Sequence, residues 1–265
     1  MNAQTIVTET EPLLLWRQDG GVLHLTLNRP QQSNALSKQM LAALREAFIR
    51  VGEDASVRAV VLGASGRAYC AGHDLRQISE NMRLDYLQGL FADCSRVMGQ
   101  IRRLPQPVIA RVQGVATAGG CQLVASCDLA VAAETARFAA SGIDIGLFCA
   151  TPAVPLSRNI GQKQAFEMLV TGEFIDARTA LERGLVNRVV PAAELDAEIG
   201  RLTASILAKP AQALAAGKSL FYRQREMGVE AAYQLAVQVM AGNALDPDAQ
   251  EGVAAFLEKR PPDWR

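Results

Sequence analysis

The chain has 265 residues, of which 49% are hydrophobic and 20% charged, and its 27 basic and 27 acidic side chains give a formal net charge of zero. A balanced charge argues against a nucleic-acid partner, which favours a basic stripe with aromatic side chains for stacking. The apolar stretches are interrupted well short of a membrane span, so no membrane partner is expected. The length is enough for one large core or two packed units.

The cysteines and the first residues of the chain bear on the compartment. The five cysteines form no C-x-x-C pair and are odd in number, which indicates reduced thiols packed as small hydrophobes and predicts no metal site. Residues 1–11 contain no arginine, unlike a secretory or mitochondrial presequence. We therefore expect a cytoplasmic protein.

Hydrophobic periodicity and turn residues predict an alternation of strands and helices. A hairpin is expected around Asp19-Gly20-Gly21, and Ser37 is placed to cap the first helix. In chain order the expected elements are strands at 13–16 and 21–27, a helix at 37–51, a strand at 57–62, a helix at 84–103, a strand at 107–112 and a helix at 119–125.

After Pro191 the pattern becomes all helical, with alanine-rich helices expected from Ala193, Pro210 and Val229. This change of pattern predicts two parts, an α/β core at residues 1–192 and a helical region at residues 193–265. One sequence in the helical region, Gly217-Lys218-Ser219, ends like a phosphate-binding loop. The glycine that such a loop requires five residues earlier is replaced by Gln212, so no nucleotide site is expected there.

Two glycine-containing turns each follow an apolar strand. The run 107–112 leads through residues 114–120 into a helix, and the strand 57–62 leads into the turn at 69–75. A helix N-terminus carries unpaired N–H groups and partial positive charge, and glycines allow a ligand to approach them closely. Such turns are typical of an anion or oxyanion site.

Together these turns and two further motifs resemble the enoyl-CoA hydratase/isomerase (crotonase) family, and most closely its enoyl-CoA hydratase domain-containing protein 3 subgroup. The motifs lie in the family's order at residues 25–36, 69–75, 114–128 and 251–260. The resemblance implies an α/β fold in which a right-handed spiral of ββα units, residues 1–192, binds acyl-CoA. It also implies that the helices of residues 193–265 associate the chain into a homotrimer or a hexamer built as a dimer of trimers.

In the family, two backbone N–H groups polarise the thioester carbonyl and stabilise the enolate formed from it. The resemblance places these groups at the amides of His73 and Gly119. Coenzyme A is then part of the substrate, and no separate cofactor is expected. The resemblance implies a substrate site made of Ser33, Ala35, Leu36, Ala71, Asp74, Leu75, Arg76 and Gly142, with Phe256 and Lys259 supplied by a neighbouring subunit.

Hydration of a 2-enoyl-CoA requires one group to activate water and another to protonate the alpha carbon, and the family's hydratases use two glutamates. Those positions fall on Gln122 and Gly142. An amide can orient a water molecule but cannot take its proton. Hydration is therefore doubtful, although membership of this family still suggests a lyase or isomerase of fatty acid metabolism.

Two side chains are alternatives for the missing acid or base. If the segment around Gly142 were extended, Asp144 would lie on the same side about 6.6 Å along the chain, unless it simply faces solvent. His73 titrates near neutrality and occurs in the same turn in a decarboxylase branch of the family, or it contributes its amide alone. By contrast, His24 alternates with leucines on the polar face of a strand and is expected at the surface.

Two functions of different class remain open. The first is an enzyme that performs enolate chemistry on an acyl-CoA, including decarboxylation assisted by His73. The second is a CoA-ester binding or regulatory protein without turnover. Both oxyanion turns are retained, which favours an enzyme, but fold alone does not establish function.

Overall fold

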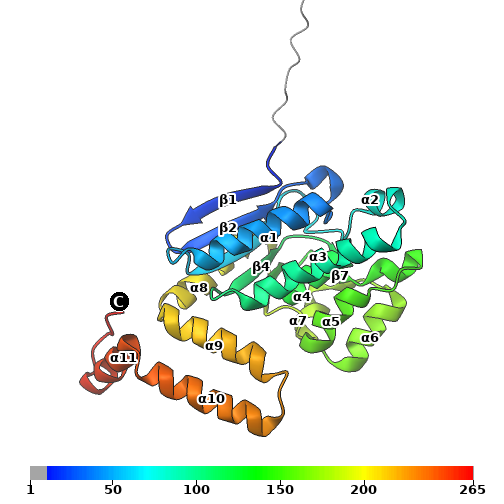
Figure 1. The fold of residues 1–265 in the computed structure, drawn as a ribbon. Coiled ribbons are helices and arrows are strands. Elements are labelled where there is room, and N and C mark those ends of the chain that lie inside the picture. Colours follow the sequence, from blue (N-terminus) through cyan, green and yellow to red (C-terminus); the bar gives the residue numbers. More distant parts are fainter. Residues whose placement is uncertain (1–10, 265) are drawn as a thin grey trace, which may run out of the picture.

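The computed structural model describes residues 11–264. Its centre is a six-stranded sheet in the order β1-β2-β3-β4-β6-β9, in which only the β1–β2 hairpin is antiparallel (Figure 1). A second, three-stranded sheet has the order β5-β7-β8. The strands are β1 Leu14–Asp19, β2 Val22–Leu27, β3 Ala59–Ala64, β4 Val108–Val112, β5 Ala116–Thr117, β6 Leu129–Ala133, β7 Arg137–Ala139, β8 Ile175–Asp176 and β9 Arg188–Val190.

The helices begin and end largely where local signals predict. Ser37 accepts a hydrogen bond from the Met40 N–H at 3.1 Å and so caps α1, as its position before an apolar-periodic run suggests. The α-helices are α1 Lys38–Glu53, α2 Leu75–Glu80, α3 Leu84–Arg103, α4 Gly119–Ser126, α5 Ala150–Asn159, α6 Gln162–Thr171, α7 Ala177–Glu182, α8 Leu195–Leu207, α9 Ala211–Gln224, α10 Val229–Ala244 and α11 Pro247–Glu258.

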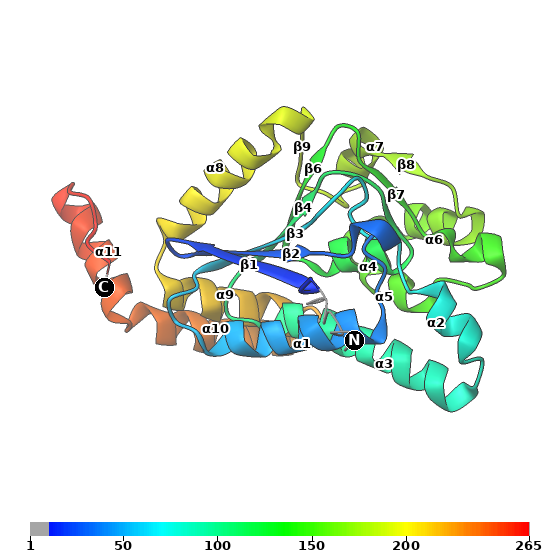
Figure 2. The same cartoon turned by 90° about the horizontal axis from the view of Figure 1, so that it is seen from above.

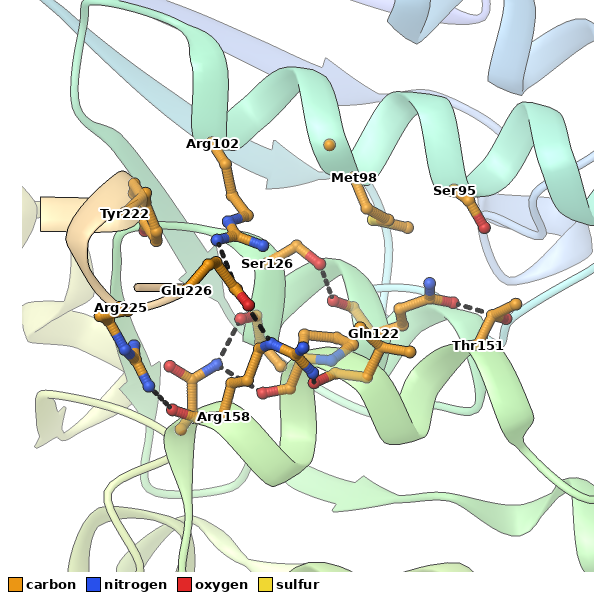
Figure 3. A pocket seen from close by; sticks show the side chains of 15 residues that line it. Ser95, Met98, Arg102, Gln122, Ser126, Thr151, Arg158, Tyr222, Arg225 and Glu226 are labelled. Atoms are coloured by element: carbon orange, nitrogen blue, oxygen red, sulfur yellow. Dashed lines mark hydrogen bonds and ion pairs between the residues drawn. The ribbon is translucent and has the colours of Figure 1, made fainter. Parts of the chain in front are cut away.

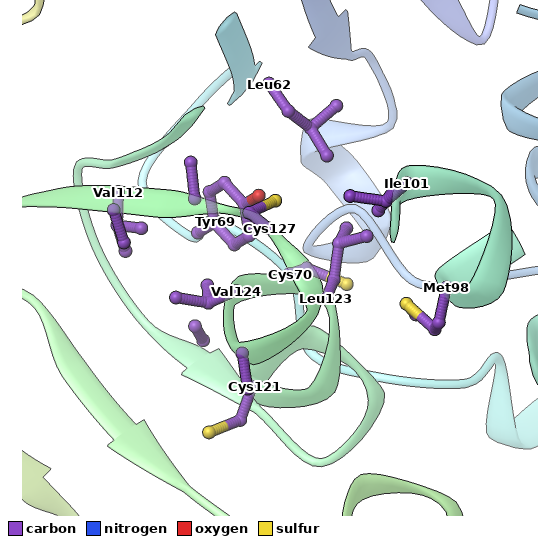
Figure 4. Packing of buried hydrophobic residues seen from close by; sticks show 14 of the residues in the cluster. Leu62, Tyr69, Cys70, Met98, Ile101, Val112, Cys121, Leu123, Val124 and Cys127 are labelled. Atoms are coloured by element: carbon purple, nitrogen blue, oxygen red, sulfur yellow. The ribbon is translucent and has the colours of Figure 1, made fainter. Parts of the chain in front are cut away.

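Helices cover both faces of the large sheet (Figure 2). The larger core packs α1, α3 and α4 against one face, and the smaller core packs α8 against the other. Both faces of β3 are buried, which is why this strand reads as a continuous apolar run instead of alternating. All five cysteines are buried and free, and Cys70, Cys121 and Cys127 lie among the aliphatic side chains of the larger core (Figure 4).

The last two helices extend away from the sheets (Figures 1 and 2). Large apolar side chains on α10 and α11 are exposed, including Tyr233, Met240 and Phe256. In contrast, α8 packs on the sheet through Leu195 and Ile199. The division of the chain near residue 192 stays a prediction.

Some expectations differ from the structure. Residues 141–145 form a 3₁₀ helix that ends at Gly146 in the left-handed region, so the assumption that this segment is extended is wrong. His24 is half-buried and so only partly at the surface, because α8 packs against that face of the sheet. No helix among residues 11–264 is long and apolar enough to cross a membrane. The expectation drawn from the N-terminus concerns residues 1–11, of which residues 1–10 lie outside the described residues.

Candidate active site

Three backbone hydrogen bonds join the loop at residues 33–36 to the turn at residues 71–74. The Ala71 N–H donates to the Ser33 carbonyl at 3.0 Å, the Leu36 N–H to the Gly72 carbonyl at 2.7 Å, and the Asp74 N–H to the Leu36 carbonyl at 3.3 Å. Two segments distant in sequence thus form one wall of a site. The wall brings together the expected residues Ser33, Ala35, Leu36, Ala71, His73, Asp74, Leu75 and Arg76.

The two glycine turns meet at this wall. Gly72 has φ +90°, and a Cβ atom there would lie 2.9 Å from the Ala118 Cβ and 3.0 Å from the Gly119 nitrogen. A Cβ atom on Gly120 would lie 2.0 Å from the Cys70 carbonyl oxygen. Glycine at these positions therefore permits the backbones of the two turns to touch.

The contact leaves two backbone amides without an acceptor. Within residues 11–264, neither the His73 N–H nor the Gly119 N–H donates a hydrogen bond. Gly119 is the first residue of α4, where the helix dipole adds partial positive charge. Ala118, just before it, has φ +50° and ψ −118°, a strained conformation for a non-glycine residue. Such strain clusters at functional sites.

These turns line a cavity of about 260 Å³. His73, Gly119 and Gly142 line it, and its other walls are largely apolar, with Phe91, Leu147 and Phe148 among them. No carboxylate belongs to this described lining. The cavity can therefore offer hydrogen-bond donors and an apolar surface, but no carboxylate base.

The Nε2 atom of the His73 ring is buried. It has no hydrogen-bond partner among the described residues, and the ring meets Phe91 edge-on with centroids 5.2 Å apart. Burial lowers the pKa of His73 to about 4. The ring is therefore neutral near pH 7 and offers one N–H donor and one acceptor.

Gln122 is 2% exposed and does not line this cavity. It lines a neighbouring cavity of about 530 Å³, and its Oε1 accepts a hydrogen bond from the Thr151 hydroxyl at 3.2 Å. Thr151 lines both cavities. Gln122 thus lies where the two cavities adjoin.

The second expected glutamate position is closed. A Cβ atom on Gly142 would lie 2.4 Å from the Leu147 carbonyl oxygen and 2.8 Å from the Cys149 Sγ. The turn that follows the 3₁₀ helix therefore occupies the space that a side chain at position 142 would need.

Asp144 is exposed and is not part of the cavity lining. Its carboxylate lies against Gly172, where a Cβ atom would come within 2.7 Å of Oδ1. The cause is the 3₁₀ helix, because consecutive residues of a helix turn by about a third of a revolution instead of alternating. A role for Asp144 as acid or base stays a prediction that this placement does not favour.

Asp74 organises the entrance to the site. Its Oδ2 pairs with Arg29 at 3.1 Å, and its Oδ1 accepts a hydrogen bond from the Arg76 N–H at 3.2 Å to cap α2. Asn34, which sequence reasoning did not single out, is fully buried. It accepts from the Arg29 N–H at 2.8 Å and donates to the carbonyls of Ser65 and Ala68 at 2.8 and 2.9 Å.

Phe256 and Lys259 are not brought to the site within one chain. Both belong to the end of α11, far from α2 and α4 in Figures 1 and 2. Phe256 is 82% exposed. Their expected contact with the substrate therefore requires a second copy of the chain. In the part of the chain that the structure describes, no group of three or more His, Cys, Asp or Glu side chains is arranged to hold a metal ion.

Comparisons with known proteins confirm the family resemblance and the fold. A model of the enoyl-CoA hydratase/isomerase family matches residues 17–265. The mouse enoyl-CoA hydratase domain-containing protein 3 is 43% identical over 258 residues, 97% of this chain and 86% of that protein. A Mycobacterium smegmatis enoyl-CoA hydratase structure is 62% identical with a TM-score of 0.95, covering 96% of this chain and 99% of that one. The structure of human enoyl-CoA hydratase domain-containing protein 3 is 42% identical with a TM-score of 0.93, and the match covers 96% of this chain and 100% of that one.

The same comparisons contradict the expected cytoplasmic location. Five relatives that are 41–43% identical are all named mitochondrial. The expectation relied on the reduced cysteines, which describe the folded protein and not its compartment, and on the lack of arginine in residues 1–11.

Proposed function

We propose that this chain, which belongs to the enoyl-CoA hydratase/isomerase family, binds an acyl-CoA thioester and stabilises the enolate formed from it. The observation that carries the proposal is the pair of amides at His73 and Gly119, which have no acceptor among the described residues and belong to touching turns beside one cavity. Coenzyme A is part of the substrate in this proposal, and no further cofactor is required.

The chemistry follows from where charge develops. The thioester oxygen gains negative charge when a carbanion forms next to the carbonyl, and preorganised N–H donors stabilise that charge without reorganisation. Removing one such donor typically costs about 3–4 kcal/mol of transition-state stabilisation. The first turn of α4 adds its dipole to the Gly119 amide. The site therefore favours lyase or isomerase reactions that pass through an enolate.

The missing glutamates argue for a reaction that needs no carboxylate base. Loss of carbon dioxide from a malonyl-type thioester produces the enolate directly, so stabilisation alone accelerates it. The buried, unpartnered Nε2 of His73 favours this second candidate. A neutral imidazole beside Gly119 can donate a hydrogen bond to the substrate carboxylate.

We also propose that the complete site is shared between copies of the chain in a homotrimer or hexamer. The exposed apolar side chains of α10 and α11 support association, because a monomer rarely exposes a large contiguous apolar patch. Association would also bring Phe256 and Lys259 of one copy toward the loop at residues 33–36 of the next. Analytical ultracentrifugation tests this, and a monomer at micromolar concentration would exclude it.

The experiment that tests the oxyanion proposal is spectroscopic. Hexadienoyl-CoA, whose conjugated thioester absorbs in the ultraviolet, should show a red-shifted band when bound, because the two amides polarise its carbonyl. Gly119→Pro, which removes one donor, should abolish the shift while a folded protein still binds the ligand. An unchanged shift in the variant would remove Gly119 from the site. The measurement reports polarisation even if the protein has no turnover.

A binding experiment tests the nucleotide end of the site. Calorimetric titration should show tighter binding of acetyl-CoA than of its 3′-dephospho analogue, because a lysine binds a phosphate as a point charge. Lys259→Ala should lose much of that preference, and added salt should weaken it. Equal affinity for both ligands would remove Lys259 from the site. Failure of both ligands to bind would refute the CoA-ester assignment.

A further inference from the structure

The cavity of about 530 Å³ beyond Gln122 has a charge pattern that enolate chemistry does not use (Figure 3). Three arginines line it, Arg102 from α3, Arg158 from α5 and Arg225 at the end of α9. Glu226 is the only acidic residue in the described lining. The walls therefore carry two more positive than negative charges.

The single carboxylate is shared. Arg102 Nη2 and Arg158 Nε approach the same oxygen of Glu226, Oε1, at 3.5 and 3.4 Å. Arg225 donates to the Arg158 backbone carbonyl and, among residues 11–264, has no carboxylate partner. Figure 3 shows the Arg158 guanidinium directed toward Glu226 and the Arg225 guanidinium directed toward the Arg158 backbone carbonyl. Guanidinium groups in such a cluster retain donors in the geometry that binds a carboxylate.

The cluster of Arg102, Arg158 and Arg225 is aligned with the oxyanion site along α4. Gly119, Gln122 and Ser126 occupy positions i, i+3 and i+7 of α4, so they lie along one face of that helix. Gly119 lines the smaller cavity, while Gln122 and Ser126 line the larger. At 1.5 Å per residue, this face of α4 extends about 10 Å from the Gly119 amide to Ser126, which lines the larger cavity together with the arginines. An acyl chain running along it from the thioester would end at the cluster.

We propose that the larger cavity binds the far end of the acyl chain and selects acyl-CoA substrates that carry a terminal carboxylate, with Arg158 and Arg225 as the groups that bind it. This rests on the proposed function and names its substrate class. The lining between the two ends is uncharged, with Gln122, Thr151, Met98 and Val154, which suits methylene groups. An unbranched chain without a terminal charge would leave the guanidinium groups facing an apolar end.

The test compares suberyl-CoA, which ends in a carboxylate, with octanoyl-CoA, which has the same chain length and no terminal charge. Calorimetry on the full chain should show suberyl-CoA binding roughly tenfold tighter, the effect of one charge-assisted hydrogen-bonded pair. Arg225→Gln and Arg158→Gln should each remove most of that preference. Glu226→Gln should increase the preference, because it frees Arg102 and Arg158 from the carboxylate that they share.

The control is Arg178→Gln, which removes an exposed arginine of α7 that pairs with Glu182. It should change neither affinity. Equal binding of the two CoA esters to the wild-type protein would overturn the inference and leave the proposed function intact, whereas failure of both to bind would refute the proposed function itself. If free suberate together with octanoyl-CoA reproduced the gain and lost it in Arg225→Gln, the arginines would bind a separate anion, and the assignment to the acyl chain would be wrong.

Discussion

Restoring both glutamates should not restore hydration. The double variant Gln122→Glu/Gly142→Glu has the two carboxylates that hydratases of this family use, and each acid–base group typically contributes 10²–10⁴-fold. A substitution that reproduced a working pair would therefore raise the rate by about 10⁴-fold or more. We expect less than a tenfold gain, because the structure leaves no room for the second side chain.

The steric cost of a side chain at position 142 follows from the turn after the 3₁₀ helix. A Cβ atom at position 142 would lie 2.4 Å from the Leu147 carbonyl oxygen, a backbone atom that cannot rotate away. Removing the Cys149 Sγ, at 2.8 Å, would not relieve that contact. Overpacking of this kind costs about 1–3 kcal/mol, and the melting temperature should fall by several degrees.

The assay is the loss of ultraviolet absorbance as crotonyl-CoA is hydrated, with urea unfolding measured in parallel. Gly142→Ala is the matched control, since it adds the clashing Cβ without a carboxylate and should be destabilised by a similar amount. A gain of 10²-fold or more in the double variant would refute the steric reasoning. A Gly142→Ala variant as stable as the wild-type protein would also refute it.

The remaining predictions concern rate, pH and packing. Wild-type hydration of crotonyl-CoA should be at least about 10²-fold slower than that of a two-glutamate hydratase assayed side by side; a comparable kcat would mean that other groups transfer the protons. Gly119→Pro should abolish turnover of any substrate found, and activity in the folded variant would contradict the oxyanion assignment. Because burial lowers the His73 pKa from 6.5 to about 4, the unfolded chain binds the extra proton first, so this contribution to stability is complete above pH 6.5 and is lost as the pH falls toward 4. His73→Phe should flatten that part of the stability profile in denaturant titrations, and an unchanged slope would show that His73 is not its source. Lys218→Met should cost about 3–5 kcal/mol in urea unfolding, because it leaves Asp128 buried without its cation; Lys163→Met at an exposed site serves as the control, and equal stability of the two variants would contradict the ion-pair argument.

Lys218 shows that a local sequence pattern can exclude one function without identifying what the residue does. The spacing of the Gly-Lys-Ser sequence excludes a nucleotide loop, but only the fold shows what the lysine does. Its Nζ donates to the carbonyls of Ile101 and Gln106, both at 2.8 Å, and pairs with Asp128. It thereby ties α9 to the ends of α3 and β4, through contacts separated by more than a hundred residues.

The sequence by itself determined those features that depend on residues close together in the chain. The Ser37 cap, the start of α4 and the glycine turns are set by local backbone preferences and hydrogen bonds, and the family follows from four motifs in order. The roles of the individual site residues stay predictions.

Only the tertiary structure decided which distant groups share a cavity. It moved Asp144 away from the site by forming a 3₁₀ helix, closed position 142 with a later turn, and collected Arg102, Arg158 and Arg225 from three helices around one space. The reason is physical: periodicity reports which face of an element is buried, whereas the groups that meet across that buried space are set by how the elements pack.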